Sequence, residues 1–226
     1  MNIALIVAAG TGSRMGTNVP KQFLLVNEKP LLVYTVEAFN QNKDIDAIYI
    51  VTSSDYLKTV KDWCALYKLN KVINILKGGK SRQESVYLGL KGISAKEDDV
   101  VLIHDGARPL VDQQIINNNI EAAKKYDAIV TVIKASDTII HSIDGENINN
   151  VPKRDELYQN QTPQTFKYGL ILKGHEYAIE NNVPNVTDDA KVALLLGKDV
   201  HLVEGSKRNF KITTEEDLEL FKALIK

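Results

Sequence analysis

A glycine-rich turn followed by two cations is the first feature of this sequence that could do chemistry. The stretch VAAGTGSRMGTNVPKQFLLV runs from Val7 to Val26, and its glycines let the backbone approach a ligand because they lack a Cβ. Backbone N–H groups in such a turn bind phosphate oxygens, and Arg14 and Lys21 follow where they could reach a triphosphate. The spacing matches neither the P-loop nor GxGxxG, because Lys21 comes eleven residues after Gly10. The alternative is a turn with two solvated basic side chains.

A second group of reactive side chains lies in the motif LIHDGARP. Asp105 and Arg108 follow a run of apolar residues, which places them at the carboxyl edge of a predicted sheet. Asp105 could hold Mg²⁺ directly or through water, or bind a substrate hydroxyl, and Arg108 could clamp a phosphate. A salt bridge between the two is the alternative. His104 has no second histidine or cysteine at metal-ligand spacing, so we predict a core or capping role for it.

The motif GGKSRQESVYLGL indicates a strand that turns into a helix. Gly79 ends the strand and Ser81 could cap the helix. Arg82 and Ser85 then lie near the helix start, where donors face an anion or a base edge. A Gly-Gly turn before a helix is common, so this motif alone does not establish a site.

The second half of the chain contributes further polar side chains. Arg154 is well placed for an anionic substrate, and Thr162 returns the chain to the sheet with a hydroxyl at its edge. Lys211 follows an apolar residue on a short predicted strand and could point inwards. Thr213 or Thr214 is predicted to cap the last helix, because acidic residues follow in its first turn.

These side chains need a scaffold that brings the ends of strands together. Short runs rich in β-branched residues alternate with stretches of helical periodicity. This alternation predicts an α/β protein with a Rossmann-like, doubly wound, mostly parallel sheet, whose ligands bind at the carboxyl ends of the strands. The predicted helices cover residues 31–40, 57–67, 84–93, 113–126 and 168–181.

The segment 137–164 interrupts the alternation. Two short extended pieces flank the turn Asp144-Gly145, which predicts a β-hairpin arm inserted in the fold. An arm of this kind often packs on a second subunit, so we predict a homodimer, with an ordinary surface hairpin as the alternative. The chain contains no internal repeat or linker-like tract, and a single domain over residues 1–226 is expected.

Composition narrows the classes of partner. There are 28 Lys and Arg against 29 Asp and Glu, a net charge of −1, so no polyelectrolyte field indicates a nucleic-acid or membrane-surface partner. The single cysteine, Cys64, excludes an internal disulfide and fits a reducing compartment. The first apolar run is too short for a signal sequence or a membrane span. We therefore expect a soluble, cytoplasmic protein.

Six motifs together resemble one family across almost the whole chain. AAGTGSRMG with PKQFL, GGKSRQESVYLGL, HDGARP, QTPQTF, TDDA and FKITTEEDL occur in the same order as in the bacterial polyol-phosphate cytidylyltransferases. This family includes the methylerythritol-phosphate enzymes of isoprenoid synthesis and the ribitol-phosphate enzymes of teichoic-acid and capsule synthesis. The resemblance implies a fold of the nucleotide-diphospho-sugar transferase type, CTP as one substrate, Mg²⁺ as the cofactor, and a homodimer.

The resemblance also implies roles for individual residues. Arg14 and Lys21 would stabilise the α-phosphate during attack, with Lys211 as a third catalytic cation, and Thr138 and Arg154 would reach across the dimer. Lys80 departs from the family, where an acidic residue is common, so no contact is assigned to its side chain. The implied CTP-binding residues are Ala8, Ala9, Gly10, Thr11, Gly12, Gly79, Arg82, Ser85, Asp105 and Gly106. The implied polyol-phosphate-binding residues are Asp105, Arg108, Thr138, Arg154, Thr162 and Lys211.

The predicted mechanism follows from charge. The attacking polyol phosphate is already an anion, so no general base is needed, and cations with Mg²⁺ remove the repulsion between the two substrates. In the part expected to touch the polyol, VPKRDELYQNQTPQTF is more similar to the ribitol-phosphate branch, and we favour ribitol 5-phosphate or a related pentitol phosphate. The alternatives are methylerythritol 4-phosphate as acceptor and a non-catalytic nucleotide-binding protein. A Rossmann dehydrogenase ranks low because its glycine spacing is missing.

Overall fold

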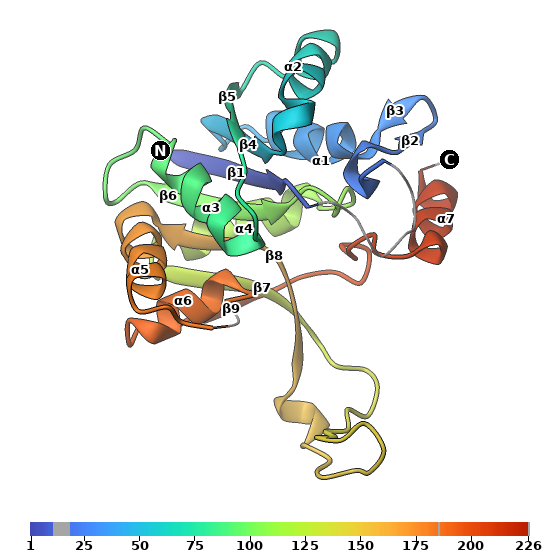
Figure 1. The fold of residues 1–226 in the computed structure, drawn as a ribbon, viewed down its shortest axis with the longest axis vertical. Helices are drawn as coiled ribbons and strands as arrows, with labels where there is room; N and C mark the ends of the chain where they lie inside the picture. The colour runs from blue at the N-terminus through green and yellow to red at the C-terminus, as the bar shows by residue number, and fades with distance from the viewer. Residues whose placement is uncertain (11–18, 185, 226) are drawn as a thin grey trace.

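One seven-stranded sheet forms the centre of the chain. The computed structural model describes residues 1–10, 19–184 and 186–225, and the sheet has the order β5-β4-β1-β6-β8-β7-β9 (Figure 1). β8 runs antiparallel to β6 and β7, and all other neighbours in the sheet pair in parallel. The predicted Rossmann-like, mostly parallel sheet is therefore confirmed. The strands are β1 (Asn2–Ala8), β4 (Ala47–Thr52), β5 (Val72–Lys77), β6 (Val100–Asp105), β7 (Ala128–Lys134), β8 (Tyr158–Lys167) and β9 (His201–Glu204).

Helices cover both faces of the sheet, because its strands are apolar on both sides. On β1, Ala4 and Ile6 belong to one buried cluster with α1, α2 and α4, whereas Ile3 and Leu5 belong to another with α3, α5 and α6. This alternation follows from the period of two residues in a strand. The helices are α1 (Leu31–Asn40), α2 (Leu57–Leu66), α3 (Arg82–Lys91), α4 (Gln113–Ala122), α5 (Tyr168–Glu180), α6 (Asp189–Leu195) and α7 (Glu215–Leu224).

Helix boundaries agree with the predicted ones to within two residues, apart from the end of α4. α3 begins at Arg82, two residues before the predicted start, because the side chain of Ser81 accepts the N–H of Glu84. α4 ends at Ala122, four residues earlier than predicted. α6 was not predicted, because its seven residues are too few to show helical periodicity.

Strand β8 is the main difference from the prediction. Residues 158–164 were expected in the arm, but they form most of a ten-residue strand between β6 and β7. Polar side chains dominate this strand, and it contains Pro163, so it lacks the usual sequence signal of a central strand. Its buried polar groups are hydrogen-bonded: Gln164 donates to Asp188, and the hydroxyl of Thr165 donates to Asn119.

The arm occupies residues 135–157 and extends away from the sheet (Figure 1). It turns at Asp144-Gly145 as predicted; Gly145 has a φ of 78°, and the carboxylate of Asp144 accepts the N–H groups of Glu146 and Asn147 at 2.9 Å each. One isolated bridge, between His141 and Asn150, joins its two sides. The arm is therefore a hairpin without regular strands. Its other side-chain hydrogen bonds near the turn join residues within the segment 142–149.

A small third cluster fixes the segment that carries Lys211. Ile212 is fully buried against α7 and the two-stranded sheet formed by β2 (Leu25–Val26) and β3 (Lys29–Pro30). Its N–H donates to the carbonyl of Ala107 at 2.9 Å. The predicted strand at Lys211 is not observed. This hydrogen bond, with another of 2.8 Å from Nη1 of Arg108 to the carbonyl of Asn209, ties the segment to the turn after β6 instead. Thr214 caps α7 in a capping box with Asp217.

Candidate active site

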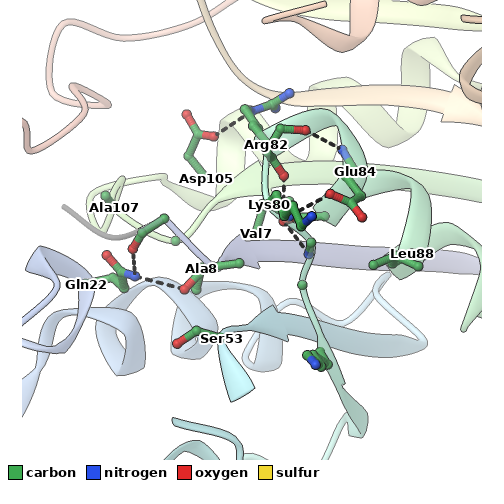
Figure 2. A pocket seen from close by; sticks show the side chains of 18 of the residues that line it. Val7, Ala8, Gln22, Ser53, Lys80, Arg82, Glu84, Leu88, Asp105 and Ala107 are labelled. Carbon is green, nitrogen blue, oxygen red and sulfur yellow. Dashed lines mark hydrogen bonds and ion pairs between the residues drawn. The ribbon is translucent and has the colours of Figure 1, made fainter. Parts of the chain in front are cut away.

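The carboxyl ends of β1, β5 and β6 open into a pocket of about 960 Å³ (Figure 2). Such strand ends are where doubly wound sheets bind ligands. The start of α3 and the segment that carries Lys211 also line it. Ten of the residues predicted for the site line this pocket: Ala8, Ala9, Gly10, Lys21, Gly79, Arg82, Ser85, Asp105, Gly106 and Lys211.

Glycines shape the wall of the pocket where backbone segments approach one another. A Cβ on Gly79 would fall on the side chain of Glu84, and one on Gly78 would fall on the side chain of Ala9. A Cβ on Gly106 would lie 3.0 Å from a side chain of β1. Larger residues would push these segments apart, so the glycines keep the strand ends close enough to surround one ligand.

The turn between β5 and α3 is held by its own side chains. The hydroxyl of Ser85 donates to the carbonyl of Ser81 at 2.8 Å and accepts the N–H of Gly79 at 3.1 Å. The carboxylate of Glu84 accepts the N–H of Lys80 at 2.6 Å. These hydrogen bonds lie within the turn itself and fix the shape of this wall of the pocket.

Asp105 is the electrostatic centre of the site. Its side chain is buried at the end of β6, and Oδ2 lies 3.0 Å from Nζ of Lys211 and 3.4 Å from Nε of Arg108. Its Oδ1 lies 3.5 Å from Nε of Arg82. Three cations from three different parts of the chain therefore meet at one carboxylate, which gathers positive charge at the pocket floor.

The surroundings of Asp105 keep it charged. Burial by itself raises the pKa of this carboxyl, but Lys211, Arg82 and Arg108 outweigh that effect and hold the pKa far below its usual range. Both of its oxygens already face cations, and in the described ranges no group of three or more His, Cys, Asp or Glu could hold a metal. The arrangement does not fit Mg²⁺ bound directly by Asp105, and a contact through water stays a prediction.

Gln22 holds the end of β1 and was not singled out from the sequence. Its side chain is 4% exposed, and its Nε2 donates to the carbonyls of Ala8 and Gly10 at 2.8 and 2.7 Å (Figure 2). Lys21, the preceding residue, begins the short 3₁₀ helix Lys21–Phe23 and lines the pocket. The glutamine thus ties Ala8 and Gly10 at the end of β1 to the short helix that begins at Lys21. The sequence signal that could have identified Gln22 was its position in the motif PKQFL.

His104 has the internal role that its sequence context predicted. Its Nε2 lies 3.2 Å from the carbonyl of Arg108, and its Nδ1 lies 3.0 Å from the hydroxyl of Thr162. Burial lowers the pKa of His104 to about 4, so the ring is neutral at neutral pH. The N–H of Asp105 also donates to the hydroxyl of Thr162, at 3.1 Å. Thr162 is therefore a buried link between β6 and β8, not an exposed hydroxyl at the edge of the sheet.

Comparison with known proteins identifies the family. The family model of IspD, 2-C-methyl-D-erythritol 4-phosphate cytidylyltransferase, matches residues 2–226. The chain belongs to this family. A Clostridium botulinum (strain Langeland) protein of that name is 46% identical over 219 residues, 97% of this chain and 95% of the relative. One from Clostridium acetobutylicum is 44% identical over 228 residues, 100% of this chain and 98% of the relative.

Solved structures agree in fold. The crystal structure of 4-diphosphocytidyl-2C-methyl-D-erythritol synthase from Anaerococcus prevotii is 31% identical, with a TM-score of 0.86, and the match covers 100% of this chain and 98% of that one. The Francisella tularensis 2-C-methyl-D-erythritol 4-phosphate cytidylyltransferase is 32% identical, with a TM-score of 0.82 and 98% of both chains covered. The protein is thus a CTP-dependent cytidylyltransferase, as the motifs predicted.

A second, smaller pocket of about 330 Å³ adjoins the first in this cytidylyltransferase. Lys211 lines both, and Arg108 lines the smaller one together with Lys207. Polar side chains from the base of the arm and from β8 complete it: Ser136, Gln159, Asn160 and Gln161. Lys211 therefore lies between the two pockets, where one cation can contact two anionic substrates.

Several predicted site residues lie elsewhere. Thr11, Gly12 and Arg14 fall outside the described residues. Thr138 and Arg154 lie in the arm, which points away from the sheet (Figure 1), and neither they nor Thr162 are among the described residues that line the two pockets. No helix in the described part of the chain is long and apolar enough to cross a membrane.

Proposed function

We propose that this cytidylyltransferase transfers CMP from CTP to 2-C-methyl-D-erythritol 4-phosphate. A phosphate oxygen of the acceptor attacks the α-phosphorus of CTP, the bond to the bridging oxygen breaks, and pyrophosphate leaves. The family match over residues 2–226 supports this acceptor. The comparisons favour it over the ribitol 5-phosphate that the sequence motifs suggested, since the relatives described above are named for methylerythritol phosphate.

The residues that line the larger pocket support the nucleotide part of the proposal. Arg82 and Ser85 at the start of α3 would bind the base and ribose, and the turn after β1 would bind the phosphates. Lys21 and Lys211 would stabilise the charge that develops on the α-phosphate during attack. Arg14 keeps the catalytic role predicted from the sequence. No general base is required, because the nucleophile is already ionised.

The acceptor would bind in the smaller pocket. Arg108 and Lys211 supply the positive charge there, next to the end of the nucleotide site where the α-phosphate would lie. Thr138 and Arg154 would come from the arm of a second subunit, so the active form would be a homodimer. The arm exposes Ile140, Ile143 and other apolar side chains, which supports contact with a partner.

In this proposal, a divalent cation enters the site bound to CTP. In the described part of the pocket floor, both carboxylate oxygens of Asp105 face cations. The triphosphate itself would therefore carry the ion. When bound there, the ion would neutralise phosphate charge and favour departure of pyrophosphate. The single domain over residues 1–226 and a cytoplasmic location likewise stay predictions.

Pyrophosphate release tests the acceptor directly. The enzyme is given CTP, Mg²⁺ and either 2-C-methyl-D-erythritol 4-phosphate or ribitol 5-phosphate. We expect kcat/KM to be at least tenfold higher for the methylerythritol compound. Ribitol 5-phosphate remains the second candidate, because Gln159, Asn160 and Gln161 make the smaller pocket polar enough for a longer chain of hydroxyl groups. The opposite preference would overturn the proposed acceptor.

A further inference from the structure

A buried carboxylate without an assigned role lies behind the nucleotide pocket. Asp189 is the first residue of α6, and its side chain has no exposed surface. Its Oδ2 accepts a hydrogen bond of 2.7 Å from Nη2 of Arg82. Arg82 is among the described residues that line the pocket, whereas Asp189 is not. Asp189 can therefore influence a bound nucleotide mainly through the guanidinium that it holds.

Arg82 lies between two carboxylates that compete for it. Figure 2 shows it beside Asp105, but that contact is 3.5 Å long, whereas the contact with Asp189 is 2.7 Å. The shorter, charge-assisted bond is the stronger one. Burial by itself lowers the pKa of Arg82, but the two carboxylates outweigh it and raise that pKa. The guanidinium therefore stays charged and is drawn towards α6.

Two other elements contact Asp189, one of them through a hydrogen bond. Its N–H donates to Oε1 of Gln164 on β8 at 3.0 Å. Nε2 of His175 on α5 lies 3.3 Å from its Oδ1, and both side chains are fully buried. Burial raises the pKa of Asp189, but Arg82 and His175 more than offset this and bring it to about 2. A charged group this deep is costly unless paired, so its geometry is tightly specified.

We propose that Asp189 is a positioning residue for nucleotide binding, which holds the guanidinium of Arg82 in the orientation that receives CTP. Without this carboxylate, Arg82 would move onto Asp105, where Lys211 already pairs at 3.0 Å. That shift would narrow the base and ribose part of the pocket. This inference rests on the proposed function only in that CTP is the nucleotide bound.

Asp189→Asn tests the proposal, because the amide keeps the size of the side chain and removes its charge. CTP binding is measured by calorimetry without acceptor, and KM values for CTP and acceptor are measured separately. We expect CTP binding to weaken by about tenfold to a hundredfold, as for loss of a charged hydrogen bond, with the acceptor KM unchanged. Asp189→Glu should recover part of the loss. Glu180→Gln, an exposed change on α5, serves as the control and should bind like the wild type.

A double-mutant cycle separates positioning from a structural role. In an Arg82→Ala background, Asp189→Asn should cause no further loss of CTP affinity, because the residue through which it acts is gone. Wild-type affinity in Asp189→Asn, or the same loss in both backgrounds, would overturn the proposal. If circular dichroism shows that Asp189→Asn does not fold, the same cycle with His175→Gln decides, with a smaller loss expected that again depends on Arg82. A wild type that binds CTP but uses neither acceptor would count against the proposed function alone.

Discussion

The nucleotide side and the acceptor side of the site are built in different ways. The larger pocket is formed by strand ends and helix starts of one chain, and side chains such as Gln22 and Ser85 fix its walls. The smaller pocket lies at the base of the arm, and the arm residues Thr138 and Arg154 are absent from its described lining. In our proposal, a single chain therefore specifies nucleotide recognition, whereas acceptor recognition depends on a second chain.

Lys211 belongs to both sides, so its loss should have the largest effect. We expect Lys211→Ala to lower kcat by about 10²–10³-fold, since it removes one preorganised cation from the transferring phosphate. Pyrophosphate release with saturating CTP and acceptor measures this, and circular dichroism checks the fold. Lys222→Ala, an exposed change on α7, is the matched control and should keep wild-type turnover. An increase in KM with kcat unchanged would mean that Lys211 only binds substrate.

Arg154 tests whether the acceptor side needs a second chain. Arg154→Ala should raise the acceptor KM by about tenfold or more, the usual cost of losing one charged contact, and leave CTP affinity unchanged. At an acceptor concentration well below the wild-type KM, where both variants are slow, a mixture of Arg154→Ala and Lys211→Ala should be more active than the sum of the two alone. Mixed dimers would contain one site with an intact lysine and an intact partner arm. Absence of any recovery, with exchange of subunits verified, would contradict a shared site.

Gln22 tests whether the nucleotide side is fixed in advance. Gln22→Ala removes the hydrogen bonds to the carbonyls of Ala8 and Gly10 at 2.8 and 2.7 Å, at a cost of about 1–3 kcal/mol for the buried groups left unpaired. We expect CTP affinity to fall by about tenfold, because the turn and Lys21 lose their anchor. The acceptor KM serves as the internal control and should change little. Calorimetry with CTP, and urea unfolding for stability, measure the two effects.

The smallest predicted effect concerns acid stability of the nucleotide side. Against the effect of burial, Arg82 and His175 lower the pKa of Asp189 to about 2, below its ordinary value of 3.8, so it contributes stability that is present above pH 4 and lost as the pH falls towards 2. The contribution is about 2 kcal/mol. Urea unfolding between pH 2 and pH 5 should show a shallower pH dependence in Asp189→Asn. Arg154→Ala, on the exposed arm, should keep the wild-type slope; equal slopes in all three proteins would contradict this assignment.

The sequence predicted the scaffold well wherever local patterns carry the information. The runs that become β1, β4 and β6 are rich in β-branched residues and end in glycine or a polar residue, so both the strands and the location of the pocket could be predicted. Caps are equally local: Ser81 and Thr214 stand where helices begin. The placement of ten predicted residues around one pocket follows from these two kinds of signal.

Strand β8 and Asp189 could not be predicted, because their environment is made by distant residues. β8 buries Gln161, Thr162 and Gln164, and a polar strand becomes stable in a sheet interior only when partners from elsewhere satisfy its hydrogen bonds. Asp189 pairs with a residue 107 positions away. Sequence periodicity does not indicate a contact between two residues so far apart in the chain.

By itself, the sequence determined the doubly wound sheet, the helix caps and the family, because each depends on local sequence patterns or on the order of motifs. The tertiary structure decided which charges meet. It brought Arg82, Arg108 and Lys211 to the single carboxylate of Asp105, made Thr162 an internal link between β6 and β8, and left Thr138 and Arg154 out of the described lining of both pockets. Electrostatic pairing depends on distance in space, and only the packing of the sheet sets that distance.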